Sequence, residues 1–465
     1  MKNSFINSFY ACLLIMMIQA CKLTDVTNLA PEYKLDENSV VTDIPSAEKL
    51  LAGAYYTLRY DDMSGSIPYH TSLMGVNVSS IDPKNTPYLN NTVPTDNQVL
   101  NGSIYAGPYQ MIQTANWVIE KTSALNTNLP RKAGIIAEAR FLRALGHFYI
   151  LRLFGQFWDL NSSFGVEIRD KSILPINARA TVKDSYDFIL ADLNEAIQHC
   201  PEYITGAKVK KGYATKLAAK AIKSRVLLYK GDYPGSALLA KEVMNGPAVL
   251  SPDFLNMFIK DKYYSNEVIL GSITLFKNAD NYSEPSKLFY WDTYNSGALS
   301  PHYLALLAND PRKSIMVAPD PNYPDEPIAN AKFSVGVDDG YNDTEYYFRL
   351  AEAYLIYAEA EIRKDGGSLN EALNAVNTLR IKRGAHMLTA NNKSELLALI
   401  RREKELELGV ESGEDWFDIV RYIKNGDVQA TTVKHSLRDE NKLILPIPQI
   451  SVDASKNIIK QNPGY

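Results

Sequence analysis

The residues best suited to ligand chemistry lie around Trp291, in the stretch KLFYWDTYNSG. Tyr290 and Tyr294 flank this tryptophan, and Asp292 and Asn295 lie in the same stretch. A flat aromatic face stacks on the apolar C–H face of a sugar ring, while neighbouring Asp or Asn side chains hydrogen-bond the hydroxyls. The cluster therefore predicts contacts with a sugar.

A second group of candidates lies earlier in the chain and offers the same chemistry. Tyr69, Asn77 and Tyr88 fall in residues 61–102, a segment rich in Pro and Asn with no regular hydrophobic pattern. Long irregular segments in compact proteins are usually functional or disordered. For each aromatic residue in both groups, an alternative role remains open, which is to anchor a long loop to the rest of the protein.

The chain offers little for catalysis. It lacks HExxH, P-loop and GxSxG motifs, and its six histidines are scattered at positions 70, 147, 199, 302, 386 and 435. Glycoside hydrolysis needs only two carboxylates. The densest acids are Glu403, Glu405, Glu407 and Glu411, and their Lys and Arg neighbours on a predicted helix indicate a solvated, ion-paired face.

We therefore expect no catalytic residues and no cofactor. The acids of the later loops lack the spacing of a calcium-binding loop, so we also expect no metal site. A glycan-degrading enzyme remains the less favoured alternative. The formal net charge is -4, and Lys and Arg are mixed among Asp and Glu, so the sequence has no basic patch. This excludes nucleic acid as a partner.

The N-terminus is typical of a lipoprotein signal peptide, residues 1–20. Lys2 precedes the apolar run Phe9–Ile18, which is too short to span a bilayer because that requires about twenty residues. Ala20 followed by Cys21 resembles the cleavage box of bacterial lipoproteins. We expect a mature chain that begins at a lipid-modified Cys21, with residues 21–44 as an extended tether. The alternative is a short buried helix with an ordinary cysteine.

The elements that must position these residues are helices. The longest helical pattern begins at Pro130 and ends at Gly155, where we expect a left-handed residue to close the last turn. Ala137, Phe141 and Ala144 follow the spacing of the second helix in a tetratricopeptide repeat, where small residues admit a neighbouring helix. This spacing predicts a helix that is buried on nearly every side.

The repeat pattern returns twice. LLYKGDYPGSALLAKEVM places Gly231 at a helix-to-helix corner, and RLAEAYLIYAEA begins at Arg349. The intervening segments 156–180 and 261–345 are irregular, and only Val268–Phe276 has the pattern of a strand. We therefore expect a predominantly α fold of tetratricopeptide-like helix pairs, with long irregular loops and minor β structure, forming one domain over residues 45–465.

Several motifs, taken in order, resemble the SusD/RagB family of outer-membrane nutrient-binding lipoproteins. They are the box at Cys21, EARFLRALGHFYILRLFG from Glu138, RLAEAYLIYAEA from Arg349, ALNAVNTLR from Ala372, WFDIVR from Trp416, LPIP from Leu445 and the closing QNPGY. The family usually carries a cation just before Trp-Phe-Asp, whereas this chain carries Asp415 there.

The resemblance implies a cell-surface protein that is lipid-anchored in the outer membrane. It implies a SusC-like TonB-dependent transporter as partner, to which the protein delivers a captured oligosaccharide. The loop segments 61–102 and 261–345 would face the ligand. A peptide ligand is the alternative, because the family motifs lie in helices while ligand choice lies in loops. A cytoplasmic repeat scaffold that binds only proteins is the third class, and the lipoprotein box argues against it.

Overall fold

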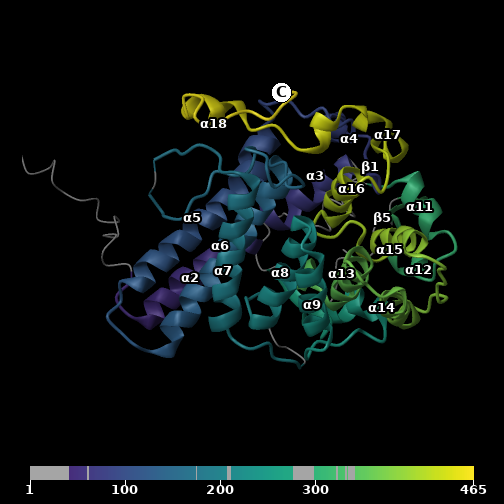
Figure 1. Cartoon of the computed structure of the whole chain (residues 1–465), viewed down its shortest axis with the longest axis horizontal. Helices are drawn as coiled ribbons and strands as arrows, with labels where there is room; N and C mark the ends of the chain where they lie inside the picture. The colour runs from purple at the N-terminus through teal and green to yellow at the C-terminus, as the bar shows by residue number, and fades with distance from the viewer. Residues whose placement is uncertain are drawn as a thin grey trace, which may run out of the picture.

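The computed structural model describes residues 41–59, 62–173, 175–206, 211–275, 298–320, 323–329, 332 and 341–465. Helices make up most of these ranges, and the strands are few and short (Figure 1). This confirms the predicted predominantly α fold.

The first half of the described chain is a stack of paired helices. Its six helices are α2 (Ile44–Arg59), α5 (Ala106–Ser123), α6 (Pro130–Phe154), α7 (Val182–His199), α8 (Lys216–Lys230) and α9 (Tyr233–Met244). From α6 to α9, each helix packs against the preceding one, and α2 packs against α5 and α6. The corner between α8 and α9 is Gly231 with a φ of 84°, as the repeat pattern predicts.

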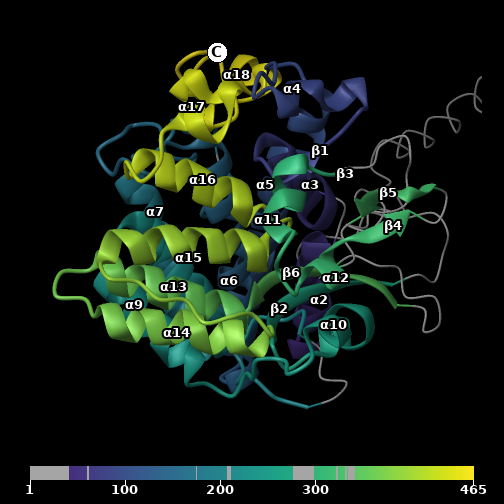
Figure 2. The same ribbon diagram turned by 90° about the vertical axis from the view of Figure 1, so that its right-hand side faces the viewer.

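The second half continues the stack, because α13 packs against α9 and α14 (Figure 2). Its long helices are α13 (Leu350–Arg363), α14 (Leu369–Lys382), α15 (Lys393–Leu408) and α16 (Glu414–Lys424). Its short helices are α10 (Phe254–Asn256), α11 (Pro301–Leu307), α12 (Lys313–Met316), α17 (Ala430–Val433) and α18 (Gln449–Ala454). The side chain of Ser368 accepts a hydrogen bond from the Glu371 amide at 3.2 Å and so caps α14.

Helix α6 lies at the centre of the first half. Ala137, Phe141 and Ala144 are all buried, which confirms the repeat spacing. Gly146 allows close approach of α5, since a Cβ added there would lie 2.8 Å from Ile112 Cγ1. The expected left-handed Gly155 is wrong: its φ is -104° and its ψ is 153°. Glycine is needed there for space, because an added Cβ would lie 2.8 Å from the Leu151 carbonyl oxygen.

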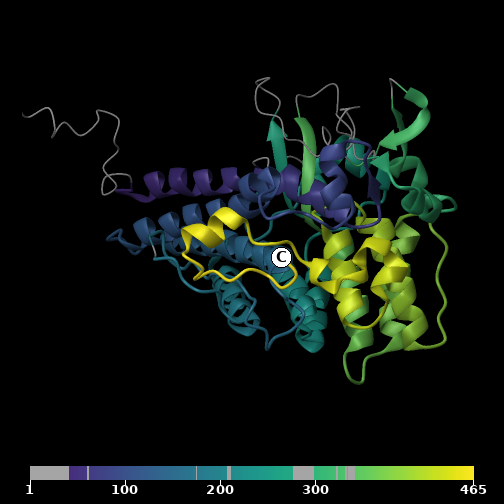
Figure 3. The same ribbon diagram turned by 90° about the horizontal axis from the view of Figure 1, so that it is seen from above.

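Three two-stranded antiparallel sheets complete the described fold. They are β1 (Val78–Ser79) with β3 (Ala298–Leu299), β2 (Val268–Leu275) with β6 (Tyr341–Arg349), and β4 (Ala318–Asp320) with β5 (Tyr323–Ala329). Strand β2 confirms the predicted strand. The sequence does not predict the other strands, because their short lengths or polar residues hide the alternation of apolar and polar residues that identifies a strand. Seen from above, the teal and green strands lie on the opposite side of the molecule from the teal helices (Figure 3).

The segment 61–102 is more regular than its sequence predicts. It contains α3 (Ile67–Met74), α4 (Thr86–Leu89), and π-helical turns at Asp62–Ser66 and Leu100–Tyr105. Every residue of α3 is buried, polar ones included. A helix buried on all sides shows no division into a polar and an apolar face, and that division is the signal from which sequence analysis recognises a short helix.

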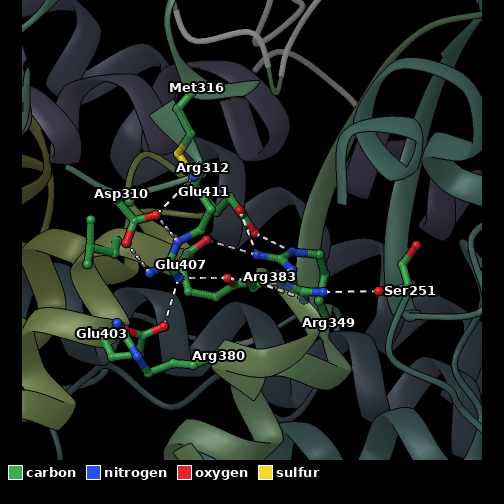
Figure 4. A network of polar contacts seen from close by, with 12 residues as sticks. Ser251, Asp310, Arg312, Met316, Arg349, Arg380, Arg383, Glu403, Glu407 and Glu411 are labelled. Carbon is green, nitrogen blue, oxygen red and sulfur yellow. Dashed lines mark hydrogen bonds and ion pairs between the residues drawn. The ribbon is translucent and has the colours of Figure 1, made fainter. Parts of the chain in front are cut away.

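A buried network of charges connects the second loop segment to the helix stack (Figure 4). Glu407 on α15 accepts hydrogen bonds from Arg349 of β6 at 3.0 Å, Arg383 after α14 at 2.9 Å and Arg312 before α12 at 3.1 Å. All four side chains have no exposed surface. The network therefore fixes three separate segments to one carboxylate.

The predicted solvated face is wrong for three of the four acids assigned to it, of which Glu403, Glu405 and Glu407 lie on α15 and Glu411 follows this helix. Glu403, Glu407 and Glu411 are buried, and only Glu405 is partly exposed. Their arginine partners, such as Arg349, come from other elements of the fold. The spacing of charges along one helix shows only the neighbours on that helix, so it could not reveal this pairing.

Candidate functional site: a cleft where the two loop segments meet

The two loop segments that were predicted to face a ligand meet in the backbone of β1 and β3. Val78 pairs with Leu299 and Ser79 pairs with Ala298. Beside this ladder, the Ser300 amide donates a hydrogen bond to the Asn77 carbonyl oxygen at 2.8 Å. Residues far apart in the sequence are thereby brought together at one edge of α16.

A cleft of about 300 Å³ opens beside this junction. Its walls come from the end of α3, from α11, α15 and α16, and from the segment around α17, which lie together on the right of Figure 1. The lining residues are Val76, Asn77, His302, Arg401, Lys404, Glu405, Leu408, Glu414, Asp415, Asp418, Ile419, Tyr422, Val428, Thr432 and Val433. The cleft thus combines apolar side chains with several charged groups, as ligand sites commonly do.

Most charges on these walls are neutralised by a neighbour. Lys404 Nζ lies 2.5 Å from Asp418, and Glu414 lies 2.6 Å from Arg152 Nη1. His302 Nε2 lies 2.7 Å from Glu405 Oε1, and this hydrogen bond raises the pKa of His302. The opposite charges in these pairs therefore compensate each other within the protein.

Asp415 differs from the other acids of the cleft. Its Oδ1 accepts from the Trp416 amide at 3.0 Å and from Ser72 Oγ at 3.4 Å, and its Oδ2 accepts from Asn77 Nδ2 at 3.4 Å. No cationic side chain in the described ranges forms an ion pair with it. Burial raises the pKa of this carboxyl to about 7, and Glu405 adds to the rise.

Asn77 is the second incompletely paired group. The side chain is fully buried, its Nδ2 donates to Asp415, and its Oδ1 accepts no hydrogen bond from any residue that the structure describes. A buried polar atom without a partner is rare in native proteins and calls for an explanation. Asp415 and Asn77 therefore both line the cleft, and each carries an acceptor oxygen with spare capacity.

The predicted ligand residues of the first loop segment differ in their positions relative to the cleft. Of the first loop's three, only Asn77 borders the cleft. Tyr69 and Tyr88 are 2% and 0% exposed, and their hydroxyls bond to Asn85 at 2.8 Å and Asn97 at 3.0 Å. Neither ring offers a face to a ligand in this structure, and this burial favours the alternative role of anchoring the loop for both residues.

The remaining predicted residues lie outside the described ranges. These are the lipidation site Cys21 and the cluster Tyr290, Trp291, Asp292, Tyr294 and Asn295. They stay predictions of the sequence. Conversely, the sequence analysis did not select His302, Glu405 or Asp415 as site residues. One feature of the sequence did point to Asp415: it occupies the position where the family that the chain resembles usually has a cation.

The fold and the cleft together define a class: a helical-repeat protein in which insertions between the helix pairs, and not the repeats alone, form the cleft. Residues 32–228 match the sequence model of a family described as starch-binding and associating with the outer membrane. Residues 317–465 match the SusD family. The chain belongs to the SusD/RagB family, as its motifs predicted.

Individual relatives are similar over most of the chain. A SusD-like protein P2 from Formosa agariphila is 24% identical over 444 residues, covering 81% of this chain and 83% of the relative. A SusD superfamily structure from Bacteroides thetaiotaomicron has a TM-score of 0.77 at 24% identity, covering 91% of this chain and 100% of that one.

A third relative was solved with a ligand. Surface glycan-binding protein A from Bacteroides thetaiotaomicron, in complex with laminarihexaose, has a TM-score of 0.73 at 18% identity. The similarity covers 91% of this chain and 100% of that structure. At this identity, the similarity establishes a shared fold. Among the described helices, none is both long enough and apolar enough to cross a membrane.

Proposed function

We infer that this protein is a lipid-anchored binding protein of the outer cell surface, which captures an oligosaccharide and delivers it to a SusC-like TonB-dependent transporter. No bond is made or broken in this role. The observation that carries the proposal is the meeting of both loop segments at a polar and apolar cleft on a SusD-type scaffold.

Two comparisons support a glycan as ligand. One matching family is described as starch-binding and associating with the outer membrane, and one structural relative was solved with laminarihexaose. The chain's own residues agree with this chemistry, since the cleft presents acceptor oxygens beside apolar side chains such as Ile419 and Val433.

The direct test is a binding screen of the purified protein against polysaccharides by affinity electrophoresis, with laminarin and starch among them. We expect retarded migration in at least one glycan. The same incubations are assayed for new reducing ends, which should not form. A protein that releases reducing ends is an enzyme, and that result would contradict the proposed role.

The Trp291 cluster gives a sharper prediction. Trp291→Ala should weaken binding of the glycan found in the screen at least tenfold, roughly 1.4 kcal/mol, because an aromatic stacking face is lost. Trp117→Ala is the matched control, since Trp117 lies on α5 with 44% of its surface exposed and away from the cleft. Isothermal calorimetry measures both variants. An unchanged affinity for Trp291→Ala would remove this residue from the site.

The anchor is tested separately by metabolic labelling with palmitate. The wild type should incorporate label, and Cys21→Ala should lose it, because lipid modification requires that thiol. Cys200→Ala is the control: Cys200 is a buried thiol on the described fold and should leave labelling unchanged. Equal labelling of the wild type and Cys21→Ala would favour the cytoplasmic alternative.

A further inference from the structure

Among the described residues, not every acidic side chain that lines the cleft has a cationic partner. The pairs Lys404 with Asp418 and His302 with Glu405 are internal to the walls. Arg401 lies over the ring of Tyr422, with its guanidinium carbon 5.6 Å from the centroid. Among the described residues, this leaves Asp415 as a buried acid of the cleft without an ion-pair partner.

The acceptor beside it is also incomplete. Asn77 lines the same cleft, and its buried Oδ1 receives no hydrogen bond from the described residues. The bonds that Asp415 does receive from Ser72 and Asn77 are long, at 3.4 Å each. Hydrogen bonds of this length are weaker than ordinary hydrogen bonds between the same groups. Among the described residues, the corner therefore has too few hydrogen-bond donors for its acceptor oxygens and no positive charge paired with Asp415.

We propose that this corner of the cleft binds a protonated primary amine of the ligand, with the Asp415 carboxylate as its counter-charge and Asn77 Oδ1 as a second acceptor. The inference rests on the proposed function in one respect, which is that the amine belongs to an amino-sugar unit of a captured oligosaccharide. An ammonium group supplies three donors and one positive charge, which matches what the corner lacks.

Other occupants match less well. A calcium ion takes six to eight oxygen ligands, and the described residues contain no group of three or more acidic, His or Cys side chains arranged to hold a metal. A neutral hydroxyl would donate one hydrogen bond but leave the charge of Asp415 uncompensated in a buried wall, which is unfavourable. The amine chemistry occurs both in amino sugars and in lysine side chains, so the experiment has an arm for each.

The test compares ligands that differ only at the amine. Calorimetry at pH 7 measures binding of a glucosamine oligosaccharide and of its fully N-acetylated counterpart of equal length. A lysine-containing peptide and its N-acetyl-lysine counterpart form the second arm. We expect the free-amine oligosaccharide to bind at least tenfold more tightly than the acetylated one, because acetylation removes the charge.

Variants assign the effect to the corner. Asp415→Asn keeps the shape of the side chain and should abolish the preference for the free amine while retaining affinity for the acetylated oligosaccharide. Asn77→Leu removes the second acceptor and should reduce the preference severalfold. Glu395→Gln is the matched control, because Glu395 is an exposed acid of α15 that does not line the cleft. Its preference for the amine should remain.

Each outcome bears on one proposal. Equal binding of both oligosaccharides, or a preference that survives in a folded Asp415→Asn variant, overturns the amine site and leaves glycan capture standing. A preference for the lysine peptide, with no glycan bound either here or in the polysaccharide screen, supports the amine chemistry and overturns glycan capture. Binding of none of the four ligands overturns the amine site, while the polysaccharide screen still decides glycan capture.

Discussion

Glu407→Gln is expected to lower the free energy of unfolding by about 3–5 kcal/mol, which is the usual cost of removing one partner from a buried ion pair. Three guanidinium groups, from Arg312, Arg349 and Arg383, share this carboxylate (Figure 4). Glutamine keeps the shape of the side chain but removes the charge. The arginines would then stay buried around fewer negative groups.

The pH dependence has a definite sign. Burial alone would raise the pKa of Glu407, but the neighbouring Arg383, Arg349 and Arg312 outweigh burial and hold it well below its ordinary value of 4.5. A carboxyl with a lowered pKa in the folded state stabilises the protein above its ordinary pKa, and this contribution is lost as the pH falls through the folded value. The stability difference between wild type and Glu407→Gln should therefore be largest above pH 4.5 and narrow below it.

Thermal unfolding followed by calorimetry measures this difference. Glu405→Gln is the control, because it is the same substitution on the same helix at a partly exposed position, where Glu405 pairs with His302 alone among the described residues. Exposed pairs contribute at most about 1 kcal/mol. If both variants unfold at the same temperature as the wild type, the shared carboxylate does not hold the loop segment to the scaffold.

The scaffold could be predicted from sequence where its signals are local. The small-aromatic-small spacing from Ala137 to Ala144 and the glycine corner between two helices at Gly231 each depend on a few neighbouring residues, and both are confirmed. The predicted fold class is confirmed for the same reason. Local patterns of this kind are enough to identify paired helices.

The candidate site could not be predicted in the same way, because it depends on contacts between distant residues. Asn77 and Asp415 are 338 positions apart and meet only through the β1–β3 junction and α16. Helix α3 gave no signal because all its residues are buried. The burial of Glu407 depends on arginines from three other segments, so its charge pattern resembled that of an exposed helix face.

Asp415→Asn is expected to have the opposite effect on stability, making the protein without ligand more stable at neutral pH. Burial raises the pKa of Asp415 from 3.8 to about 7. A raised pKa in the folded state means that the protonated carboxyl is favoured there. Its stabilising contribution is complete below pH 3.8 and is lost as the pH rises to about 7, at about 1.4 kcal/mol for each pH unit.

Asparagine resembles the protonated carboxyl and does not titrate. Its new amide group can also donate to Asn77 Oδ1 if the Asn77 amide rotates, which would satisfy the acceptor that now lacks a partner. The stability gain over the wild type should therefore grow between pH 5 and pH 8 by roughly 3 kcal/mol, and calorimetric melting at the two pH values measures it.

Asp418→Asn is the matched control on the same helix, because Asp418 is paired with Lys404 at 2.5 Å and Arg421 at 2.7 Å. Losing that carboxylate should destabilise the protein at both pH values, since two buried cations lose a partner. A gain for Asp415→Asn that is equal at pH 5 and pH 8 would show that Asp415 does not titrate in this range. A gain that rises with pH, in a variant that also loses its preference for amines, would mean that the folded protein keeps an unpaired carboxylate at a cost in stability because the ligand supplies its counter-charge.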